Sequence, residues 1–371
     1  MRVVQLIDNL YWGGAQKMLS MLAHELINHQ VEVVVVGLDE DTDAHYAQQM
    51  RDDGVEVVSM AGNGLLDFVR IRRLVYFLRQ RNVDLIQTHL SYANILGVLA
   101  GRLAGIPVIV TLHSTGSDRR HYHPMRHRME TMALRSIGCQ IIAVGYAIAD
   151  AQQDRVGRKK PIVVISNAIS ILPELAPPER QKLRISLTGS DEGFVLISVG
   201  RLSPDKGYSD MLIAFRGILS SYPQTSLVIA GAGVLADSLQ AQALSLGIEG
   251  RVFLLGARDD IPALLRASDI YISASHREGM SMSLLESMAA GLPTVATNVG
   301  DASRMFTDTT GVLVEPTHPE YLAEAVNALL ADPARMKVMG IAAYERVTAK
   351  YGLEAWTDAY MDLYLHTMEK K

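Results

Sequence analysis

Short apolar runs alternate with helix-like segments along almost the whole chain, and this alternation limits the fold more than any other feature of the sequence. Most of the runs are nearly continuous in apolar residues, as in parallel strands that are buried on both faces. Regular alternation of strand and helix predicts βαβ units and doubly wound parallel sheets of the α/β class. The predicted strands are Val3–Ile7, Val31–Leu38, Val55–Met60, Asp84–Thr88, Val108–Leu112, Gln140–Val144, Ile162–Ile165, Phe194–Val199, Ser226–Ala230, Val252–Leu255, Ile270–Ser273, Thr294–Ala296 and Gly311–Val314.

The alternation is interrupted at residues 171–190, where prolines and a Thr-Gly-Ser turn predict a linker. We therefore expect two Rossmann-like domains, over residues 1–170 and 191–352. The last predicted helix, Leu353–Glu369, follows the second domain, and we expect residues 353–371 to pack back on the first. Ligands of such domains bind at the carboxyl ends of the strands, so the expected site is a cleft between the two domains.

Composition and charge exclude several classes of protein. The single cysteine, Cys139, rules out an intrachain disulfide or a cysteine metal cluster, and its apolar flanks favour a core position in a reducing compartment. No apolar stretch reaches the ~18 residues that span a bilayer, and the N-terminus lacks a signal-peptide layout. We therefore expect a cytoplasmic protein, peripheral on the inner face of the membrane if it associates with one. A formal net charge of −5 indicates no nucleic-acid partner.

Two segments of the second domain carry charged residues suited to a nucleotide. Arg201 and Lys206 lie in a Gly-Arg-Leu…Lys-Gly loop after a predicted strand, where a planar fork and a point charge can converge on a diphosphate. Glu286 lies in an apolar helix, where a carboxylate needs partners such as ribose hydroxyls. The helix begins near residues 281–283, and its free N–H groups suit phosphate. The alternatives are a solvated loop and a carboxylate on a helix surface.

The first domain offers weaker signals. Gly13 and Gly14 form a turn between the first strand and helix, where the backbone can approach a ligand closely. His113 follows a predicted strand and is expected to face the cleft, although a structural histidine is an equal alternative on position alone. The acidic run from Asp39 to Asp43 resembles a D-x-D metal motif, but its charge density is typical of an exposed loop. No cluster with metal-ligand spacing occurs elsewhere.

Together these segments resemble retaining glycosyltransferases of family 4, which have the two-domain GT-B fold. The resemblance runs nearly end to end and is most specific in the Gly-Arg-Leu…Lys-Gly loop and the block from Glu278 to Glu286. It departs at Ala168, where the family usually has Gly, and at residues 300–304. The resemblance implies catalytic roles for His113, Arg201, Lys206 and Glu278, and donor binding by Gly13, Gly14, Arg201, Lys206, Arg258, Glu278, Gly279, Met280, Ser281, Met282, Ser283 and Glu286.

The family resemblance also implies how these residues divide the donor. Arg201 and Lys206 would hold the diphosphate and Glu286 the ribose, while Glu278 and the backbone of 279–283 would hold the sugar. The implied enzyme is a hexosyltransferase of cell-surface polysaccharide or glycolipid synthesis that needs no metal or cofactor, with UDP favoured over GDP in its donor. The alternatives are a nucleotide-sugar 2-epimerase of the same architecture and a non-catalytic subunit that binds nucleotide sugars.

A basic region in the first domain adds a hypothesis about the acceptor. Residues 68–135 contain 11 basic and 3 acidic side chains. The spacing over 66–81 predicts a helix with one buried face and one arginine-rich outward face, and residues 119–128 form a second basic and aromatic cluster. Such surfaces suit an anionic membrane and a lipid-linked or saccharide acceptor, whereas the alternative is a solubilising arginine face. The expected buried residues are Ile71, Leu74, Val75 and Leu78, and the expected outward ones are Arg70, Arg73, Tyr76, Phe77 and Arg81.

Overall fold

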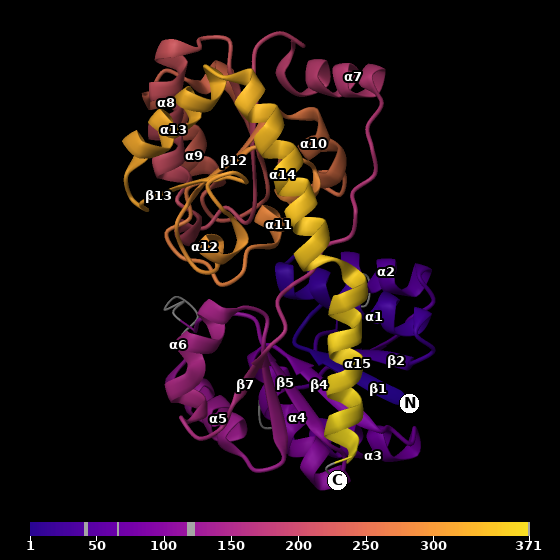
Figure 1. The fold of residues 1–371 in the computed structure, drawn as a ribbon. Coiled ribbons are helices and arrows are strands. Elements are labelled where there is room, and N and C mark those ends of the chain that lie inside the picture. Colours follow the sequence, from indigo (N-terminus) through magenta and orange to yellow (C-terminus); the bar gives the residue numbers. More distant parts are fainter. Residues whose placement is uncertain (41–43, 65–66, 117–122, 370–371) are drawn as a thin grey trace. The chain divides into compact units, whose positions relative to one another are not determined.

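The computed structural model describes residues 1–40, 44–64, 67–116 and 123–369. The chain folds into two compact units (Figure 1): unit 1 consists of Met1–Ala168 with Leu353–Lys371, and unit 2 of Ile169–Gly352. Each unit contains one parallel sheet with helices on both faces, which confirms the predicted α/β class. No helix among the described residues is long and apolar enough to cross a membrane.

Unit 1 is built on a seven-stranded sheet in the order β3-β2-β1-β4-β5-β6-β7. The order reverses between β1 and β4, which makes their carboxyl ends the topological switch point. The strands are β1 (Arg2–Ile7), β2 (Glu32–Gly37), β3 (Glu56–Ser59), β4 (Leu85–His89), β5 (Val108–Leu112), β6 (Cys139–Ala143) and β7 (Ile162–Val164). The helices are α1 (Gly14–Asn28), α2 (His45–Asp52), α3 (Phe68–Gln80), α4 (Ser91–Ala104), α5 (Pro124–Arg135), α6 (Tyr146–Val156) and α15 (Leu353–Glu369).

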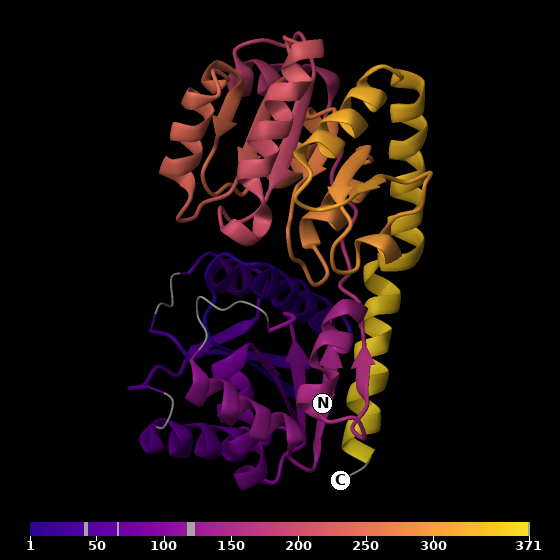
Figure 2. The ribbon, with the colours of Figure 1, turned by 90° about the vertical axis from the view of Figure 1, so that its left-hand side faces the viewer.

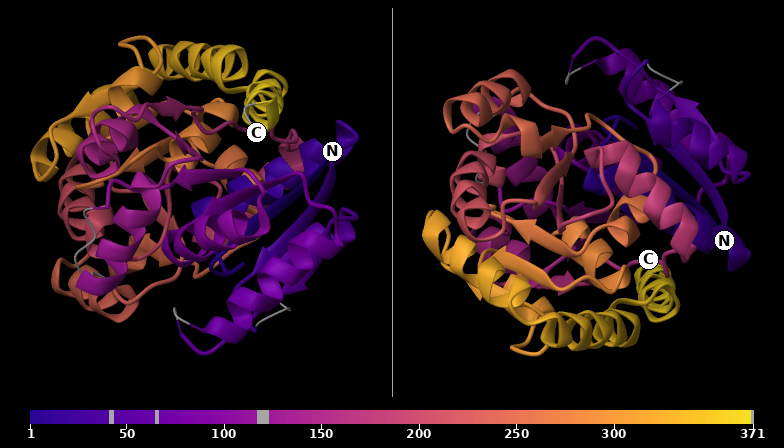
Figure 3. Two further views of the ribbon diagram at one scale, coloured as in Figure 1. Left: turned by 90° about the horizontal axis from the view of Figure 1, so that it is seen from below. Right: turned by 90° about the horizontal axis from the view of Figure 1, so that it is seen from above.

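The two faces of the unit 1 sheet are covered by different helices. Helix α4 packs between α3 and α5 on one face, and α1 and α15 pack together on the other. Figure 3 shows α15 (yellow) and α3 (purple) on opposite sides of the strands. The last helix packs on unit 1: its side chains Trp356, Tyr360 and Tyr364 belong to the core of that unit. Cys139 is buried in β6, as its apolar flanks predicted.

Unit 2 contains a six-stranded sheet in the order β10-β9-β8-β11-β12-β13, with its switch point between β8 and β11. One helical layer, α8, α9 and α13, faces the viewer in Figure 2, and the other contains α7, α10, α11 and α14. The strands are β8 (Val195–Val199), β9 (Ser226–Ala230), β10 (Val252–Leu254), β11 (Ile270–Ser273), β12 (Thr294–Thr297) and β13 (Val312–Val314). The helices are α7 (Pro177–Thr188), α8 (Tyr208–Ser221), α9 (Ala236–Ser245), α10 (Ile261–Ala267), α11 (Met282–Ala289), α12 (Ala302–Met305), α13 (Pro319–Leu330) and α14 (Pro333–Tyr351).

The segment expected as a linker contains helix α7, which is fixed to unit 2 by a charged cluster. Arg184 is buried, and its guanidinium lies 2.8 Å from Oδ2 of Asp269. Arg180 pairs with the other oxygen of the same carboxylate at 2.7 Å. The backbone N–H of Val195, the first residue of β8, also donates to Asp269. This cluster joins α7 to the start of the sheet, so the segment is part of the folded unit.

The outward face predicted for the helix over 66–81 is partly wrong. Arg70 is buried because its guanidinium turns back to donate to the carbonyl of Gly64. Phe77 is half-buried and packs against the core. Arg73, Tyr76 and Arg81 are exposed as predicted, and of the expected inward residues only Val75 is not fully buried: Ile71, Leu74 and Leu78 are. Residues 119–122 of the second basic cluster lie outside the described part of the chain.

Candidate functional site

The first predicted loop of unit 2 joins β8 to α8 and lies at the switch point of the sheet. Arg201 is exposed, and a single 3-10 turn, Pro204–Lys206, leads to Gly207. Gly207 has a φ of 64°, and a Cβ there would overlap the carbonyl oxygen of Ala274 after β11. Only glycine combines this conformation with so close an approach. The contact therefore fixes the loop that carries both cations against the end of β11.

Lys206 and Glu278 lie in direct contact, which the sequence did not predict. The ammonium of Lys206 pairs with Oε1 of Glu278, and both side chains are largely buried, at 21% and 15% exposure. The hydroxyl of Ser275 donates to the same carboxylate oxygen at 3.0 Å. Because β8 and β11 are neighbours in the sheet, their loops place a cation and a carboxylate together at one edge.

The second predicted segment forms the start of α11. Ser281 occupies the N-cap position of this helix without a side-chain capping bond, and its hydroxyl lies 3.1 Å from that of Ser283, so two hydroxyls and the free N–H groups share the helix N-terminus. Glu286 is 5% exposed within the helix, as its apolar setting predicted. The loop before α11 is held by Gly300, whose φ is 59° and where a Cβ would overlap the carbonyl oxygen of Gly279.

Two buried tyrosines that sequence reasoning missed hold the end of β8 in place. The hydroxyl of Tyr208 donates to the carbonyl of Gly200 at 3.1 Å, and that of Tyr271 donates to Val199 at 3.3 Å. Burial raises the pKa of both hydroxyls above the ordinary range, so both remain donors. Tyr208 directly follows the glycine of the loop, and its position there was the available signal.

The remaining donor residues of the family resemblance lie at the same edge of the unit 2 sheet. Arg258 follows β10 and forms a bidentate salt bridge with Asp260. Its Nε donates to Oδ1 at 2.8 Å and its Nη2 donates to Oδ2 at 2.6 Å. This guanidinium holds the pKa of Asp260 below its usual value. Met280 is buried beside α11, whereas Met282 is half-buried at its start. The loops and the helix start at the carboxyl edge of the unit 2 sheet thus carry Arg201, Lys206, Arg258, Glu278, Gly279, Met280, Ser281, Met282, Ser283 and Glu286.

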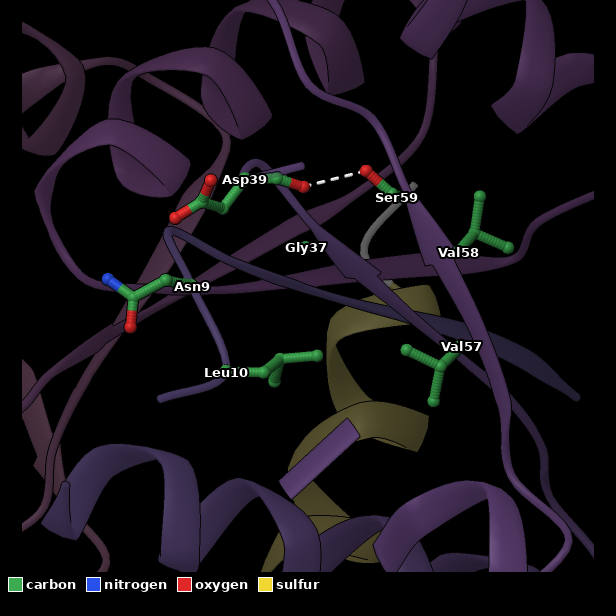
Figure 4. Close-up of a pocket in the computed structure, with 7 residues that line it drawn as sticks. All are labelled: Asn9, Leu10, Gly37, Asp39, Val57, Val58 and Ser59. Carbon is green, nitrogen blue, oxygen red and sulfur yellow. Dashed lines mark hydrogen bonds between the residues drawn. The ribbon is translucent and has the colours of Figure 1, made fainter. Parts of the chain in front are cut away.

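In unit 1 the predicted glycines lie where expected, at the start of α1. Gly13 caps the helix and Gly14 is its first residue. In the same unit, side chains at the carboxyl ends of β1, β2 and β3 line a small hollow that is open to solvent (Figure 4). Asp39 and Asn9 lie at its rim, and the hydroxyl of Ser59 donates to the backbone carbonyl of Asp39 at 2.6 Å.

The acidic run that begins at Asp39 shows no metal geometry in the part that the structure describes. Asp39 accepts a hydrogen bond from the N–H of Glu40, and Glu40 is exposed. Residues 41–43 lie outside the described chain. Among the described residues, no group of histidine, cysteine or carboxylate side chains is arranged to hold a metal ion.

His113 is bonded to a second histidine that sequence reasoning did not assign. Its Nε2 lies 2.9 Å from Nδ1 of His89, at the end of β4. The His113 side chain is half-buried, and loss of water around its imidazole lowers its pKa to about 3. Burial, and then the neighbouring His113, lower the pKa of His89 well below its usual value. Both rings are therefore neutral at physiological pH.

Asp8 is another titratable group that the sequence analysis did not single out. It follows β1 and accepts hydrogen bonds from the N–H groups of Tyr92 and Ala93 at the start of α4. Burial raises its pKa to about 7 despite these bonds. A carboxyl group poised near neutrality at the switch point of a doubly wound sheet is a candidate for ligand contact.

The fold and the site together define a class. Two doubly wound units, one with cations and carboxylates gathered at the switch point of its sheet, are the architecture of the GT-B glycosyltransferases. Two family models match the chain: Glycosyltransferase Family 4 over residues 12–171 and Glycosyl transferases group 1 over residues 179–346. The chain belongs to glycosyltransferase family 4, also called group 1, and is a glycosyltransferase that uses a nucleotide sugar.

Several proteins are similar over much of the chain. UDP-Gal:alpha-D-GlcNAc-diphosphoundecaprenol alpha-1,3-galactosyltransferase of Escherichia coli is 26% identical over 320 residues, 82% of this chain and 81% of that enzyme. Alpha-monoglucosyldiacylglycerol synthase of Streptococcus pneumoniae is 28% identical over 69% of this chain and 61% of its own length. Anabaena HepE, solved in complex with UDP-glucose, superposes with a TM-score of 0.88 at 23% identity and covers 100% of both chains.

Proposed function

We propose that this chain is a retaining, metal-independent hexosyltransferase that moves a sugar from a UDP-sugar to a hydroxyl of a lipid-linked saccharide. The observation that carries the proposal is the meeting of Lys206, Glu278 and the α11 N-terminus at the switch point of unit 2. Such a set matches the parts of one ligand: cations and helix N–H groups for a diphosphate, and a carboxylate for sugar hydroxyls. Glu286, buried one helical turn further on, would hold the ribose.

The difficult step in this reaction is departure of the diphosphate. As the bond to the anomeric carbon breaks, negative charge grows on the leaving phosphate and positive charge on the sugar. Arg201, Lys206 and the N–H groups at Ser281–Ser283 would neutralise the phosphate, and each such group typically contributes ~10²–10³ in rate. The acceptor hydroxyl would attack from the face that the diphosphate leaves, and its proton would pass to that phosphate. Glu278 would bind the sugar hydroxyls.

The choice of UDP and of a lipid-linked acceptor draws on the relatives. The Escherichia coli enzyme uses UDP-galactose and an undecaprenol-linked sugar, and HepE was solved with UDP-glucose. The synthase from Streptococcus pneumoniae makes a glycolipid by its name. In this chain the hollow beside Asn9 and Asp39 offers an amide and a carboxylate, which are suitable partners for acceptor hydroxyls.

A surface of unit 1 supports a lipid-linked acceptor. Helices α3, α4 and α5 form one layer, and their only acidic residue, Glu130, is buried in a 2.6 Å pair with Arg155. The exposed arginines of this layer are Arg72, Arg73, Arg79, Arg102, Arg128 and Arg135. Its exposed apolar side chains are Phe68, Val69, Tyr76, Leu99, Leu103, Met125 and Met132.

We assign this α3–α5 face to an anionic lipid bilayer. Each of the three helices carries both arginines and apolar side chains, whereas a protein interface more often gathers its apolar groups in a core ringed by polar residues. Arginines near an anionic lipid surface each contribute ~1 kcal/mol, and aromatic and aliphatic side chains enter the headgroup region. Arg70, which is buried, takes no part.

Vesicle sedimentation tests the bilayer assignment. Binding should increase with the fraction of anionic phospholipid and decrease with salt. Val69→Ser with Arg73→Ser should lower the partition coefficient by roughly tenfold. The matched control is Val338→Ser with Lys337→Ser on α14, because Val69 and Val338 are 68% and 65% exposed. Equal losses in both variants, or no binding to anionic vesicles at low salt, would remove the lipid surface from the proposal.

The function itself is tested with a panel of UDP-sugars and candidate acceptors. Transfer should appear only when an acceptor is present, and NMR of the product should show the anomeric configuration of the donor. Inversion at C2 of the sugar without acceptor would identify an epimerase instead. Absence of binding to every nucleotide sugar in calorimetry would favour a non-catalytic subunit.

A further inference from the structure

A hydrogen-bonded network of buried polar side chains runs through unit 1 and ends at His113. Gln5, Gln87, His89, Thr111 and His113 occupy alternate positions on three neighbouring strands or just beyond them, so they share one face of the sheet. Helix α15 covers this face and inserts a fully buried Tyr364 among them. Polar residues inside buried strands need hydrogen-bond partners, and here they satisfy one another.

The hydrogen bonds of this network all run in one donor-to-acceptor direction. Nε2 of Gln87 donates to the hydroxyl of Thr111 at 2.7 Å, and Nε2 of Gln5 donates to the hydroxyl of Tyr364 at 2.9 Å. The Tyr364 hydroxyl in turn donates to Oε1 of Gln87. Oε1 of Gln5 therefore faces His89, whose Nε2 lies 2.8 Å away.

This direction determines which ring nitrogens carry protons. A carbonyl oxygen only accepts, so Nε2 of His89 must carry the proton that it donates to Gln5. A neutral His89 then has its lone pair on Nδ1, and this atom accepts from Nε2–H of His113. The remaining nitrogen of His113, Nδ1, keeps a lone pair, and no hydrogen bond to it is formed within the described residues.

We infer that His89, Gln5, Gln87 and Tyr364 are positioning residues that hold His113 in the Nε2–H tautomer, with Nδ1 presented as an acceptor to a sugar hydroxyl. The inference rests on the proposed function and on the catalytic role that the family resemblance implies for His113. The low pKa values that burial gives both imidazoles support this inference. A charged His113 would carry a proton on each ring nitrogen and would have no lone pair to accept a hydrogen bond.

The tautomer has a consequence for donor choice. A lone pair accepts a hydroxyl proton but repels a carboxylate, so the site should favour neutral hexose donors over hexuronate donors. A donor that lacks the contacted hydroxyl would leave Nδ1 without its partner. Sites that hydrogen-bond a substrate group discriminate strongly against analogues without it.

The tautomer is tested directly on the protein without substrate. With ¹⁵N-labelled histidine, NMR should show His113 protonated at Nε2 and unprotonated at Nδ1. Tyr364→Phe should introduce the other tautomer, whereas Tyr360→Phe should not. Tyr360 is the matched control because it lies on the same helix, is equally buried, and has a hydroxyl with no partner among the described residues. A wild-type His113 protonated at Nδ1, or equal responses to both variants, would overturn the inference.

Kinetics test whether the positioning residues act on turnover through His113. His89→Leu removes the acceptor and should lower kcat/KM for the UDP-sugar by up to roughly tenfold, about the effect of one lost hydrogen bond between neutral groups. His89→Gln retains a carbonyl acceptor for His113 and should restore most of the activity. In a His113→Ala background, His89→Leu should have little further effect. An additive loss there would show a merely structural role.

These experiments separate two kinds of failure. If the wild type turns over no nucleotide sugar although NMR finds the Nε2–H tautomer, the proposed transferase reaction is wrong and the assigned hydrogen-bond direction stands. If turnover is normal and the tautomer is the opposite one, the positioning inference is wrong and the proposed function stands.

Discussion

At the scale of single residues, the two cations of the β8–α8 loop should control departure of the diphosphate. Arg201→Ala and Lys206→Ala should each lower kcat by at least ~10², because each removes a charge that stabilises the leaving group. Arg216→Ala, which removes an exposed arginine of α8, is the control and should leave kcat unchanged. Steady-state kinetics with a UDP-sugar measures both, and near-normal turnover of either loop variant would refute the assignment.

His113 and His89 make the stability of unit 1 depend on pH. The pKa of His113 falls from an ordinary 6.5 to about 3 on folding, so between these values the unfolded chain binds more protons. The free energy of unfolding should therefore rise with pH, by about 1.4 kcal/mol per pH unit for this imidazole. Asp8 has the opposite sign, because its pKa is raised to about 7.

Comparison with variants separates these two contributions. His113→Asn should flatten the pH dependence between about pH 4 and 6, and Asp8→Asn should steepen it. Both tryptophans, Trp12 and Trp356, belong to unit 1, so urea denaturation followed by tryptophan fluorescence reports on this unit. Identical slopes for the wild type and His113→Asn would mean that His113 does not have the lowered pKa.

The sequence predicted which charged residues follow the strands of unit 2, but it did not predict the contacts between them. Arg201, Lys206, Glu278 and Glu286 were identified from charge and position, because strand ends in a parallel sheet share an edge. The Lys206–Glu278 contact depends on β8 and β11 being neighbours, and strand order is not visible in one sequence. Gln5 lies among apolar residues of a buried strand, and that anomaly was a readable signal for the network.

At the scale of elements, helix α7 should depend on its charged cluster. Asp269→Ala leaves the buried Arg184 without a counter-charge and should destabilise unit 2 by about 3–5 kcal/mol. Asp308→Ala removes an exposed carboxylate of the same unit, and its effect should stay within about 0.5 kcal/mol. Hydrogen exchange of unit 2 amides measures both, and equal protection in the two variants would contradict this role for the cluster.

Elements were predicted correctly where the apolar pattern alone determines them. The predictions failed where a local turn determines the structure. All predicted strands are present, because buried parallel strands are nearly continuous in apolar residues. The prolines of 171–190 indicated a linker, yet Pro177 and Pro178 occupy the first turn of α7, where proline is well tolerated. Arg70 has the spacing of an outward residue, but its bond to the Gly64 carbonyl depends on the loop before α3.

For the molecule as a whole, we predict a transferase that works without a divalent metal. In the proposed reaction, Arg201, Lys206 and the α11 N-terminus would supply the positive charge that a metal supplies in other enzymes. Turnover of the UDP-sugar should be unchanged by excess EDTA and should not rise when Mg²⁺ or Mn²⁺ is added. Loss of activity with EDTA that Mn²⁺ restores would contradict the proposed chemistry.

Calorimetry tests whether the carboxyl edge of unit 2 binds the nucleotide and the sugar of a UDP-sugar through different residues. Glu286→Ala should weaken both UDP and UDP-sugar, because ribose belongs to both ligands. Glu278→Ala should weaken only the UDP-sugar and should leave UDP binding equal or tighter, because Lys206 is released from its pair. Glu324→Ala, which removes an exposed carboxylate of α13, should change neither affinity. Equal losses of UDP affinity in the Glu278 and Glu286 variants would show that these two carboxylates do not bind separate parts of the donor.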